Sequence, residues 1–149
     1  MTSVRSRAGQ TRLALALSAA AALLLAAVTV SAGVAGMLAR PEWRPIGTAA
    51  ELRQAGPQLF TLENSEFYLA WVGSTPIALS TRDPHKGCRI RWYPEWRLFA
   101  DPCGGSAYDP DGRYRRGPSP RSMDELPTRV VGGRVEVDVT RIIPGRQHV

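Results

Sequence analysis

Beyond residue 56, short runs with strand signals are separated by glycine, proline or asparagine, and two of the runs, Gln58–Leu62 and Glu66–Val72, alternate apolar and polar residues. An alternation with period two is typical of half-buried β-strands. The pattern predicts strands at Gln58–Leu62, Glu66–Val72, Thr75–Ser80, Arg89–Tyr93, Arg97–Ala100, Thr128–Val131 and Arg134–Val139. Residues 49–55 are compatible with a short helical turn, and no amphipathic helix is predicted after residue 56. The sequence therefore predicts an all-β fold, a small antiparallel barrel or sandwich.

Turn residues join several of the predicted strands. Asn64-Ser65 and Gly73-Ser74 separate the first three, and Gly132-Gly133 separates the last two. Two glycines between apolar runs are a strong signal for a two-residue β-hairpin. The polar stretch 109–121, which is rich in glycine and proline, is expected to be a surface loop.

A different pattern precedes residue 40. Residues 13–39 contain no charged side chain, and three arginines (Arg5, Arg7 and Arg12) come before them. As a helix this stretch would measure about 40 Å, enough to cross a hydrocarbon layer of about 30 Å with some tilt. The arginines favour a cytoplasmic N-terminus.

This pattern predicts a single-pass protein of the cell membrane. We expect a basic cytoplasmic segment at 1–12, a transmembrane signal anchor at 13–39, an extracytoplasmic domain at 41–142 and a flexible tail at 143–149. A cleavable signal peptide, cut near Val30-Ser31-Ala32, is the alternative. Residues 40–50 contain two prolines and are expected to form the linker that leaves the membrane.

The net charge of +6 arises mainly around the predicted anchor. Four of the 19 basic residues lie at positions 5, 7, 12 and 40, which leaves 15 basic against 13 acidic residues in the remainder. A nearly neutral domain gives no reason to expect a nucleic-acid partner. The chain also lacks a recognisable nucleophile–base pair or phosphate-binding loop, so neither an enzyme nor a small-molecule substrate is predicted.

The chain has only two cysteines, Cys88 and Cys103, with 14 residues between them. Two cysteines in an exported domain point to one disulfide. Closing a loop of this length contributes about 3 kcal/mol on the chain-entropy model.

The two cysteine regions resemble the Rieske iron–sulfur domain family. That family has a first loop C-x-H-x-G-C, a second loop C-x-C-H-G-S-x-[YF]-D and a Gly-Pro-x-Pro loop. The corresponding segments here read DPHKGC (residues 83–88), DPCGGSAYD (residues 101–109) and GPSP, which contains Gly117, Pro118 and Pro120. The resemblance extends over about residues 42–142 and implies a Rieske-like fold with two cysteine-bearing loops.

The resemblance also assigns roles to single residues. Cys88 and Cys103 match the family's structural disulfide, which supplies no iron ligand. Ser106 and Tyr108 match residues that donate hydrogen bonds to the cluster's sulfur atoms, although both hydroxyls could instead satisfy polar groups of a tight loop.

The positions of the four cluster ligands are mostly changed. Asp83 and Asp101 stand where the family has its cysteine ligands, Gly104 replaces one histidine ligand, and His85 alone is kept. Iron–sulfur clusters are held mainly by thiolates, carboxylates suit harder ions, and glycine offers no donor at all. We therefore predict that a [2Fe-2S] cluster is not retained.

Three arrangements could occupy the vacated position. A cation, from His85, Arg82 or Arg89, could lie between the two aspartates and relieve their repulsion. A single divalent metal ion could be bound by Asp83, His85 and Asp101. Reduced cysteines could form a third site from His85, Cys88, Asp101 and Cys103, although an oxidising compartment favours the disulfide.

The predicted function is that of a membrane-anchored structural, accessory or binding subunit in a membrane redox complex, without a cofactor. The alternative is an electron-transfer protein in which unusual ligands hold a [2Fe-2S] cluster. A mononuclear metal protein is a further alternative.

Overall fold

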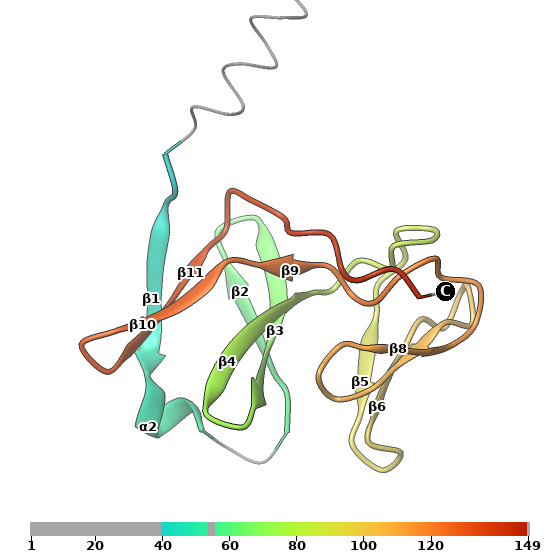
Figure 1. Cartoon of the computed structure of the whole chain (residues 1–149), viewed down its shortest axis with the longest axis horizontal. Helices are drawn as coiled ribbons and strands as arrows, with labels where there is room; N and C mark the ends of the chain where they lie inside the picture. Colours follow the sequence, from blue (N-terminus) through green and yellow to red (C-terminus); the bar gives the residue numbers. More distant parts are fainter. Residues whose placement is uncertain (1–39, 54–55, 149) are drawn as a thin grey trace, which may run out of the picture. The chain divides into compact units, whose positions relative to one another are not determined.

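The computed structural model describes residues 40–53 and 56–148, and the residues beyond Arg40 form one compact unit. Within the described residues the chain forms strands and one short helix, so the predicted all-β class is confirmed (Figure 1). The elements are β1 Trp43–Thr48, α2 Ala49–Leu52, β2 Gln58–Leu62, β3 Ser65–Val72, β4 Thr75–Ser80, β5 Arg91–Tyr93, β6 Leu98–Ala100, β7 Ala107–Tyr108, β8 Tyr114–Arg116, β9 Glu125–Leu126, β10 Thr128–Val131 and β11 Arg134–Asp138.

The predicted cytoplasmic segment 1–12 and the predicted anchor 13–39 lie outside the described residues. Among the residues that are described, no helix has the length and apolar character needed to cross a membrane.

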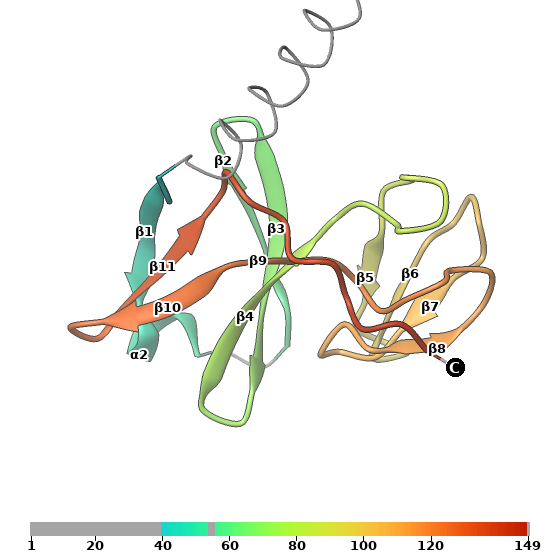
Figure 2. The ribbon, with the colours of Figure 1, turned by 45° about the horizontal axis from the view of Figure 1, so that its top comes forward.

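The strands form three antiparallel sheets. Their orders are β1-β11-β10, β2-β3-β4-β9 and β5-β6-β7-β8. Figures 1 and 2 show the first two sheets together on one side of the domain and the third sheet, with its loops, on the other. We call the β5–β8 sheet and its connecting loops the loop-bearing lobe.

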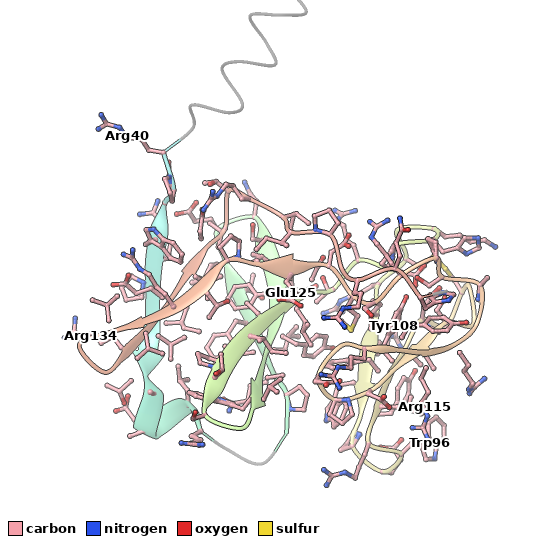
Figure 3. The ribbon with its side chains drawn as sticks, viewed as in Figure 1. Arg40, Trp96, Tyr108, Arg115, Glu125 and Arg134 are labelled. Atoms are coloured by element: carbon pink, nitrogen blue, oxygen red, sulfur yellow. A yellow bond between two sulfur atoms is a disulfide. The ribbon has the colours of Figure 1, made fainter. Side chains whose placement is uncertain are left out.

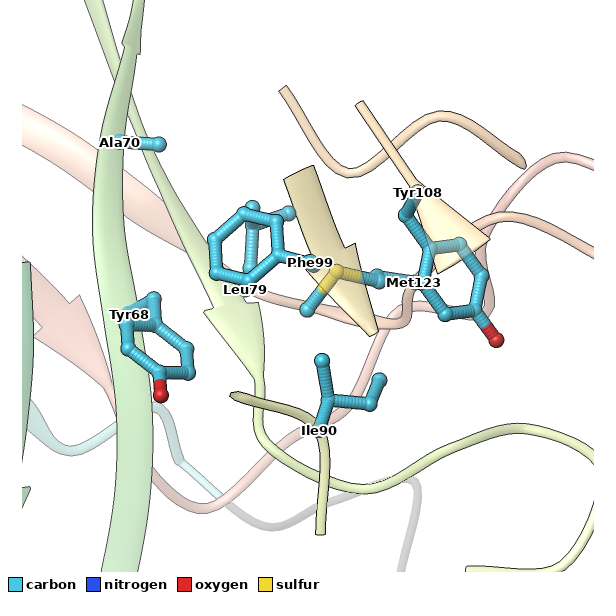
Figure 4. Packing of buried hydrophobic residues seen from close by; sticks show 7 residues of the cluster. All are labelled: Tyr68, Ala70, Leu79, Ile90, Phe99, Tyr108 and Met123. Atoms are coloured by element: carbon cyan, nitrogen blue, oxygen red, sulfur yellow. The ribbon is translucent and has the colours of Figure 1, made fainter. Parts of the chain in front are cut away.

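Strand β3 holds the two sides of the domain together because both of its faces are buried. Successive side chains of a strand point to opposite faces. Phe67 and Leu69 accordingly pack with Val135 and Val137 of β11 and their neighbours. Tyr68 and Ala70 point the other way, into a cluster completed by Leu79, Ile90, Phe99, Tyr108 and Met123 (Figure 4). This second cluster attaches the loop-bearing lobe to the central sheet.

The hairpin predicted at Gly132-Gly133 is confirmed. These residues connect β10 to β11, and their φ angles are 57° and 77°. Positive φ at both central residues is the geometry of the type I′ turn, which matches the twist of the two strands that it joins.

Four strands escaped the sequence prediction: β1, β7, β8 and β9. Strand β1 lies within the predicted linker and pairs with β11 at the edge of its sheet, where Pro45 does not interrupt a central ladder. Strand β8 lies within the predicted surface loop 109–121. Strands β7 and β9 have two residues each, too few to show a period.

The C-terminal segment differs from the predicted flexible tail. Ile143 and Glu125 exchange two backbone hydrogen bonds of 2.7 and 2.8 Å, and the Ser122 N–H donates to the Arg146 carbonyl. The His148 ring stacks on Tyr114 at a centroid distance of 3.6 Å. In both ribbon views the segment runs from β11 to the loop-bearing lobe, so it lies along the domain (Figures 1 and 2).

Candidate functional site

Two loops of the loop-bearing lobe contain the residues singled out in the sequence. The first loop, residues 81–90, connects β4 to β5, and the second loop, residues 101–106, connects β6 to β7. The predicted disulfide between Cys88 and Cys103 is present and joins the loops, with a Cα–Cα distance of 6.5 Å. The two loops are therefore fixed to each other covalently.

Each loop contains an aspartate whose backbone closes the turn that follows it in the same way. In the first loop the Asp83 N–H donates to the Cys88 carbonyl, and the Asp83 carbonyl accepts from the Gly87 N–H, both at 2.8 Å. In the second loop the Asp101 N–H donates to the Ser106 carbonyl, and its carbonyl accepts from the Gly105 N–H, both at 2.9 Å. The two segments are thus alike in backbone hydrogen bonding as well as in sequence.

The aspartate side chains also accept hydrogen bonds from backbone N–H groups of their own loops. Asp83 Oδ2 accepts from the backbone N–H groups of His85 and Lys86, at 2.8 and 3.1 Å. Asp101 Oδ1 accepts from the Cys103 N–H at 2.9 Å. Both aspartates are almost completely buried, with exposed fractions of 2% and 1%. Buried carboxylates of this kind are stable only with such donors.

Tyr108, the last residue of β7, links this strand to the first loop. Its hydroxyl donates to Asp83 Oδ1 at 2.5 Å, and the whole side chain is inaccessible to solvent. Figure 3 shows Tyr108 inside the lobe, whereas Trp96 and Arg115 lie toward its periphery. Burial raises the pKa of Tyr108, and the hydrogen bond to Asp83 raises it further. The phenol therefore stays protonated and keeps donating to the carboxylate.

The second aspartate has one oxygen without a partner. Asp101 Oδ2 is buried and accepts no hydrogen bond from any described residue. It lies only 2.2 Å from the position that a Cβ atom at Gly104 would occupy, and His85 Nδ1 lies 3.8 Å from the same position. The carboxylate of Asp101 therefore fills the space in which a side chain at residue 104 would begin.

This arrangement predicts that residues 101 and 104 are energetically coupled. We expect Gly104→Ala to lower the free energy of unfolding by about 1–3 kcal/mol, because the added methyl overlaps Asp101 Oδ2. The φ angle of Gly104 is not positive, so backbone strain adds nothing. In an Asp101→Ala background the same change should be neutral or slightly stabilising, since the overlap is gone and the unfolded chain loses freedom.

Urea unfolding of the four proteins of this double-mutant cycle measures the coupling. Gly105→Ala is a suitable comparison, because no atom lies within 4 Å of a Cβ atom there and only its positive φ is unfavourable. Equal effects of Gly104→Ala in both backgrounds would contradict the proposed overlap.

The proline loop packs closely against the second loop. A Cβ atom at Gly117, where φ is 107°, would lie 2.5 Å from the Ser106 Cα atom, so only glycine fits this approach. The Tyr114 hydroxyl donates to the Gly117 carbonyl at 2.6 Å. Pro118 and Pro120 are exposed on either side of the buried Ser119.

The hydroxyl of Ser106, beneath this loop, is buried and has no hydrogen-bond partner among the described residues.

In the described part of the chain, neither Asp83 nor Asp101 forms an ion pair. Arg89, one of the predicted cations, pairs with Glu66 through two hydrogen bonds of 2.6 and 2.9 Å. The predicted ionic plug is wrong in this structure, because backbone N–H groups and the Tyr108 hydroxyl take the place of a cation.

One set of possible metal ligands gathers closely in the described part of the chain. The ligand atoms of Cys88, Asp101 and Cys103 all lie within 4.8 Å of one another. Asp83 and His85 do not belong to this set: Asp83 is turned toward Tyr108, and the His85 side chain is exposed. The mononuclear site of Asp83, His85 and Asp101 stays a prediction.

Comparison with known proteins finds cytochrome b6-f complex iron-sulfur subunits among the relatives, although no family model matches the chain. The cytochrome b6-f complex iron-sulfur subunit of Chlorobaculum tepidum is 22% identical over 94 residues, which cover 63% of this chain and 52% of the relative. Subunit 3 of that name from Nostoc sp. PCC 7120 is 42% identical over 55 residues, covering 37% and 28%. The chain thus spans about half, or less, of these relatives' length.

Solved structures agree on the fold. The plasma membrane Rieske protein of Synechocystis PCC 6803 superposes with a TM-score of 0.51 at 23% identity, over 63% of this chain and 97% of that one. The likeness includes almost the whole of the compared domain. These relatives and this superposition together support the Rieske domain family for this chain.

The donor atoms of this Rieske domain do not fit the family's [2Fe-2S] cluster. Asp83 already accepts three hydrogen bonds, and both cysteines are joined in the disulfide. Gly104 supplies no donor, and Asp101 Oδ2 fills the space beside it. His85 is the one residue kept from the family's ligand set.

Sequence reasoning located the two loops and the disulfide. The assignment of replaced ligand positions stays a prediction from the resemblance. Sequence reasoning missed the contact from Tyr108 to Asp83, because 25 residues separate the two and the hydroxyl was assigned only by resemblance. It also missed the relation between Asp101 and Gly104. The simultaneous change of two neighbouring ligand positions, to a carboxylate and to glycine, was the signal that could have suggested it.

Proposed function

We propose that this protein is a cluster-free Rieske-domain subunit of a membrane redox complex, and that it acts by binding rather than by catalysis. One observation carries the proposal: carboxylates complete the two loops that in the family hold the cluster. Asp83 accepts the hydrogen bond of Tyr108, and Asp101 fills the space beside Gly104. The loops therefore keep their shape without a metal.

The membrane setting of the proposal is supported from two directions. The relatives are named as subunits of the cytochrome b6-f complex. The uncharged stretch 13–39 is long enough for an anchor with a cytoplasmic N-terminus. Because the chain spans only part of these relatives, the partner complex is part of the proposal and not a finding.

The competing function is electron transfer by a [2Fe-2S] cluster with unusual ligands. It is supported by the name of the relatives, which are iron-sulfur subunits, and by the preserved double loop. Against it stands the chemistry of the donors, because carboxylates and glycine replace three of the four family ligands.

Metal analysis of the full-length chain distinguishes the two functions. The chain, purified without oxygen and without an affinity tag that binds metal, should be colourless, with iron and acid-labile sulfide near zero. The Nostoc subunit prepared in parallel provides the positive control. Stoichiometric iron and sulfide, with an electron paramagnetic resonance signal of the Rieske type, would refute the proposal.

A further inference from the structure

We propose that reduction of the Cys88–Cys103 disulfide creates a zinc-binding site formed by Cys88, Cys103 and Asp101, with a fourth position for His85 or water. The oxidised chain does not bind zinc there, because both sulfur atoms are engaged in the disulfide. This inference does not rest on the proposed function, since it concerns the reduced chain and a different metal.

The first observation is the geometry of the three side chains. Their ligand atoms already lie within 4.8 Å of one another in the oxidised protein. A tetrahedral zinc ion with Zn–S distances of about 2.3 Å holds two thiolates about 3.8 Å apart. The sulfur atoms, once released from their bond, need to separate only to that distance, and the loop backbones can stay as they are.

The second observation is the unpartnered oxygen of Asp101. Its Oδ1 atom is fixed by the Cys103 N–H at 2.9 Å, whereas Oδ2 is buried and accepts no hydrogen bond within the described chain. Leaving a buried carboxylate oxygen unsatisfied is unfavourable. A metal ion bound to Oδ2 would relieve this penalty, and the carboxylate is already held beside the two sulfur atoms.

A fourth ligand is available from the first loop. His85 Nδ1 lies 3.8 Å from the position of a Cβ atom at Gly104, the same position that Asp101 Oδ2 approaches to 2.2 Å. The imidazole is exposed and has no ion pair among the described residues, so it is free to rotate toward the metal. Two thiolates, a carboxylate and an imidazole are a donor set that suits zinc.

The chemistry requires an external reductant, which we identify by class as a dithiol. The dithiol passes two electrons and two protons to the Cys88–Cys103 bond, giving two thiols and an oxidised, disulfide form of the reductant. Zinc then binds both sulfur atoms as thiolates and releases their two protons. Cys103 is exposed and Cys88 half-buried, so a reductant can reach the bond from solvent.

The test compares zinc binding by the full-length chain in its two redox states. After reduction with a phosphine and removal of the reagent without oxygen, we expect one equivalent of zinc to bind at least 100-fold more tightly than to the oxidised chain. Cobalt substituted for zinc should give thiolate-to-cobalt absorption in the near ultraviolet and the visible bands of a tetrahedral site.

Two variants distinguish zinc binding that involves Asp101 from binding by the two thiols alone. Asp101→Asn should weaken zinc binding by the reduced chain at least 10-fold. Asp109→Asn, which changes a half-exposed carboxylate near Arg115, should leave the binding unchanged. Circular dichroism of each reduced protein shows whether the domain stays folded.

Equal zinc affinity in the two redox states would overturn the inference, as would an unchanged affinity in Asp101→Asn. A reduced chain that unfolds and binds zinc equally well with and without Asp101 would overturn it too. Because Asp101→Asn could itself unfold the loop, His85→Ala provides an independent variant at an exposed position. We expect it to shift the cobalt spectrum, and an unshifted spectrum assigns the fourth position to water.

Discussion

Asp83→Ala is expected to lower the free energy of unfolding by about 3 kcal/mol, the largest loss that we anticipate for a single substitution in the loops. The alanine removes the acceptor of three hydrogen bonds, from Tyr108, His85 and Lys86. An unsatisfied buried donor costs about 1–3 kcal/mol. Tyr108 is fully buried and cannot turn to water, whereas His85 and Lys86 are exposed residues, so solvent replaces part of their loss.

Urea unfolding of the purified chain, followed by tryptophan fluorescence, measures this effect. All four tryptophans lie between residues 43 and 96 and therefore report on the domain. Tyr108→Phe removes only the donor of the shortest of the three bonds and should cost less than Asp83→Ala. Asp109→Ala is the matched control, because Asp109 is half-exposed and its ion pair with Arg115 spans 3.7 Å. A loss for Asp83→Ala no larger than that for Asp109→Ala would show that the carboxylate does not hold the loops.

Loss of the disulfide should destabilise the domain by a similar amount, about 3 kcal/mol. Cys88 and Cys103 are 15 residues apart in sequence, and their bond is the covalent link between the two loops. Without it, the described structure still ties the first loop to β7 through Tyr108 and Asp83. The domain should therefore remain folded, with a melting temperature lower by roughly 10–20 °C.

Thermal unfolding with and without a reductant, in the presence of a zinc chelator, measures this loss. The Cys88→Ala/Cys103→Ala variant serves as the control: it should melt near the temperature of the reduced protein and should not respond to reductant. An unchanged melting temperature of the unaltered chain after reduction would contradict this prediction. It would show that hydrogen bonds and packing alone hold the two loops together.

The positions of several strands could be predicted from the amino-acid sequence alone. Strands β2, β4 and β10 were predicted at their observed bounds. The sequence of β2 alternates apolar and polar residues, as a half-buried strand does, and β4 and β10 adjoin the turn residues Gly73-Ser74 and Gly132-Gly133. The burial of both faces of β3 was not predicted. The sequence of Phe67–Ala70 does not tell whether one face or both faces of the strand are covered by other parts of the protein. Both faces are buried here because the loop-bearing lobe packs on the face opposite to the one that contacts β11.

The edge strand β1 and the order of the C-terminal segment could not be predicted from local sequence patterns. Strand β1 contains a proline and reads as a linker, yet β11 supplies its backbone partners from the far end of the domain. Residues 143–148 contain Pro144-Gly145 and show no strand or helix pattern, and they were predicted to be a flexible tail. Their hydrogen bonds come from residues 119–125, brought near by the fold.

The sequence by itself indicated the all-β class, the double loop and the disulfide, because each depends on residue type and spacing along the chain. The replacement of three cluster ligands stays a prediction from the resemblance. Tertiary structure decided how the vacated site is filled. Whether Asp83 meets a cation or the Tyr108 hydroxyl, and whether Asp101 points at its partner aspartate or at Gly104, depends on side-chain directions in two loops that only the packed sheets place together.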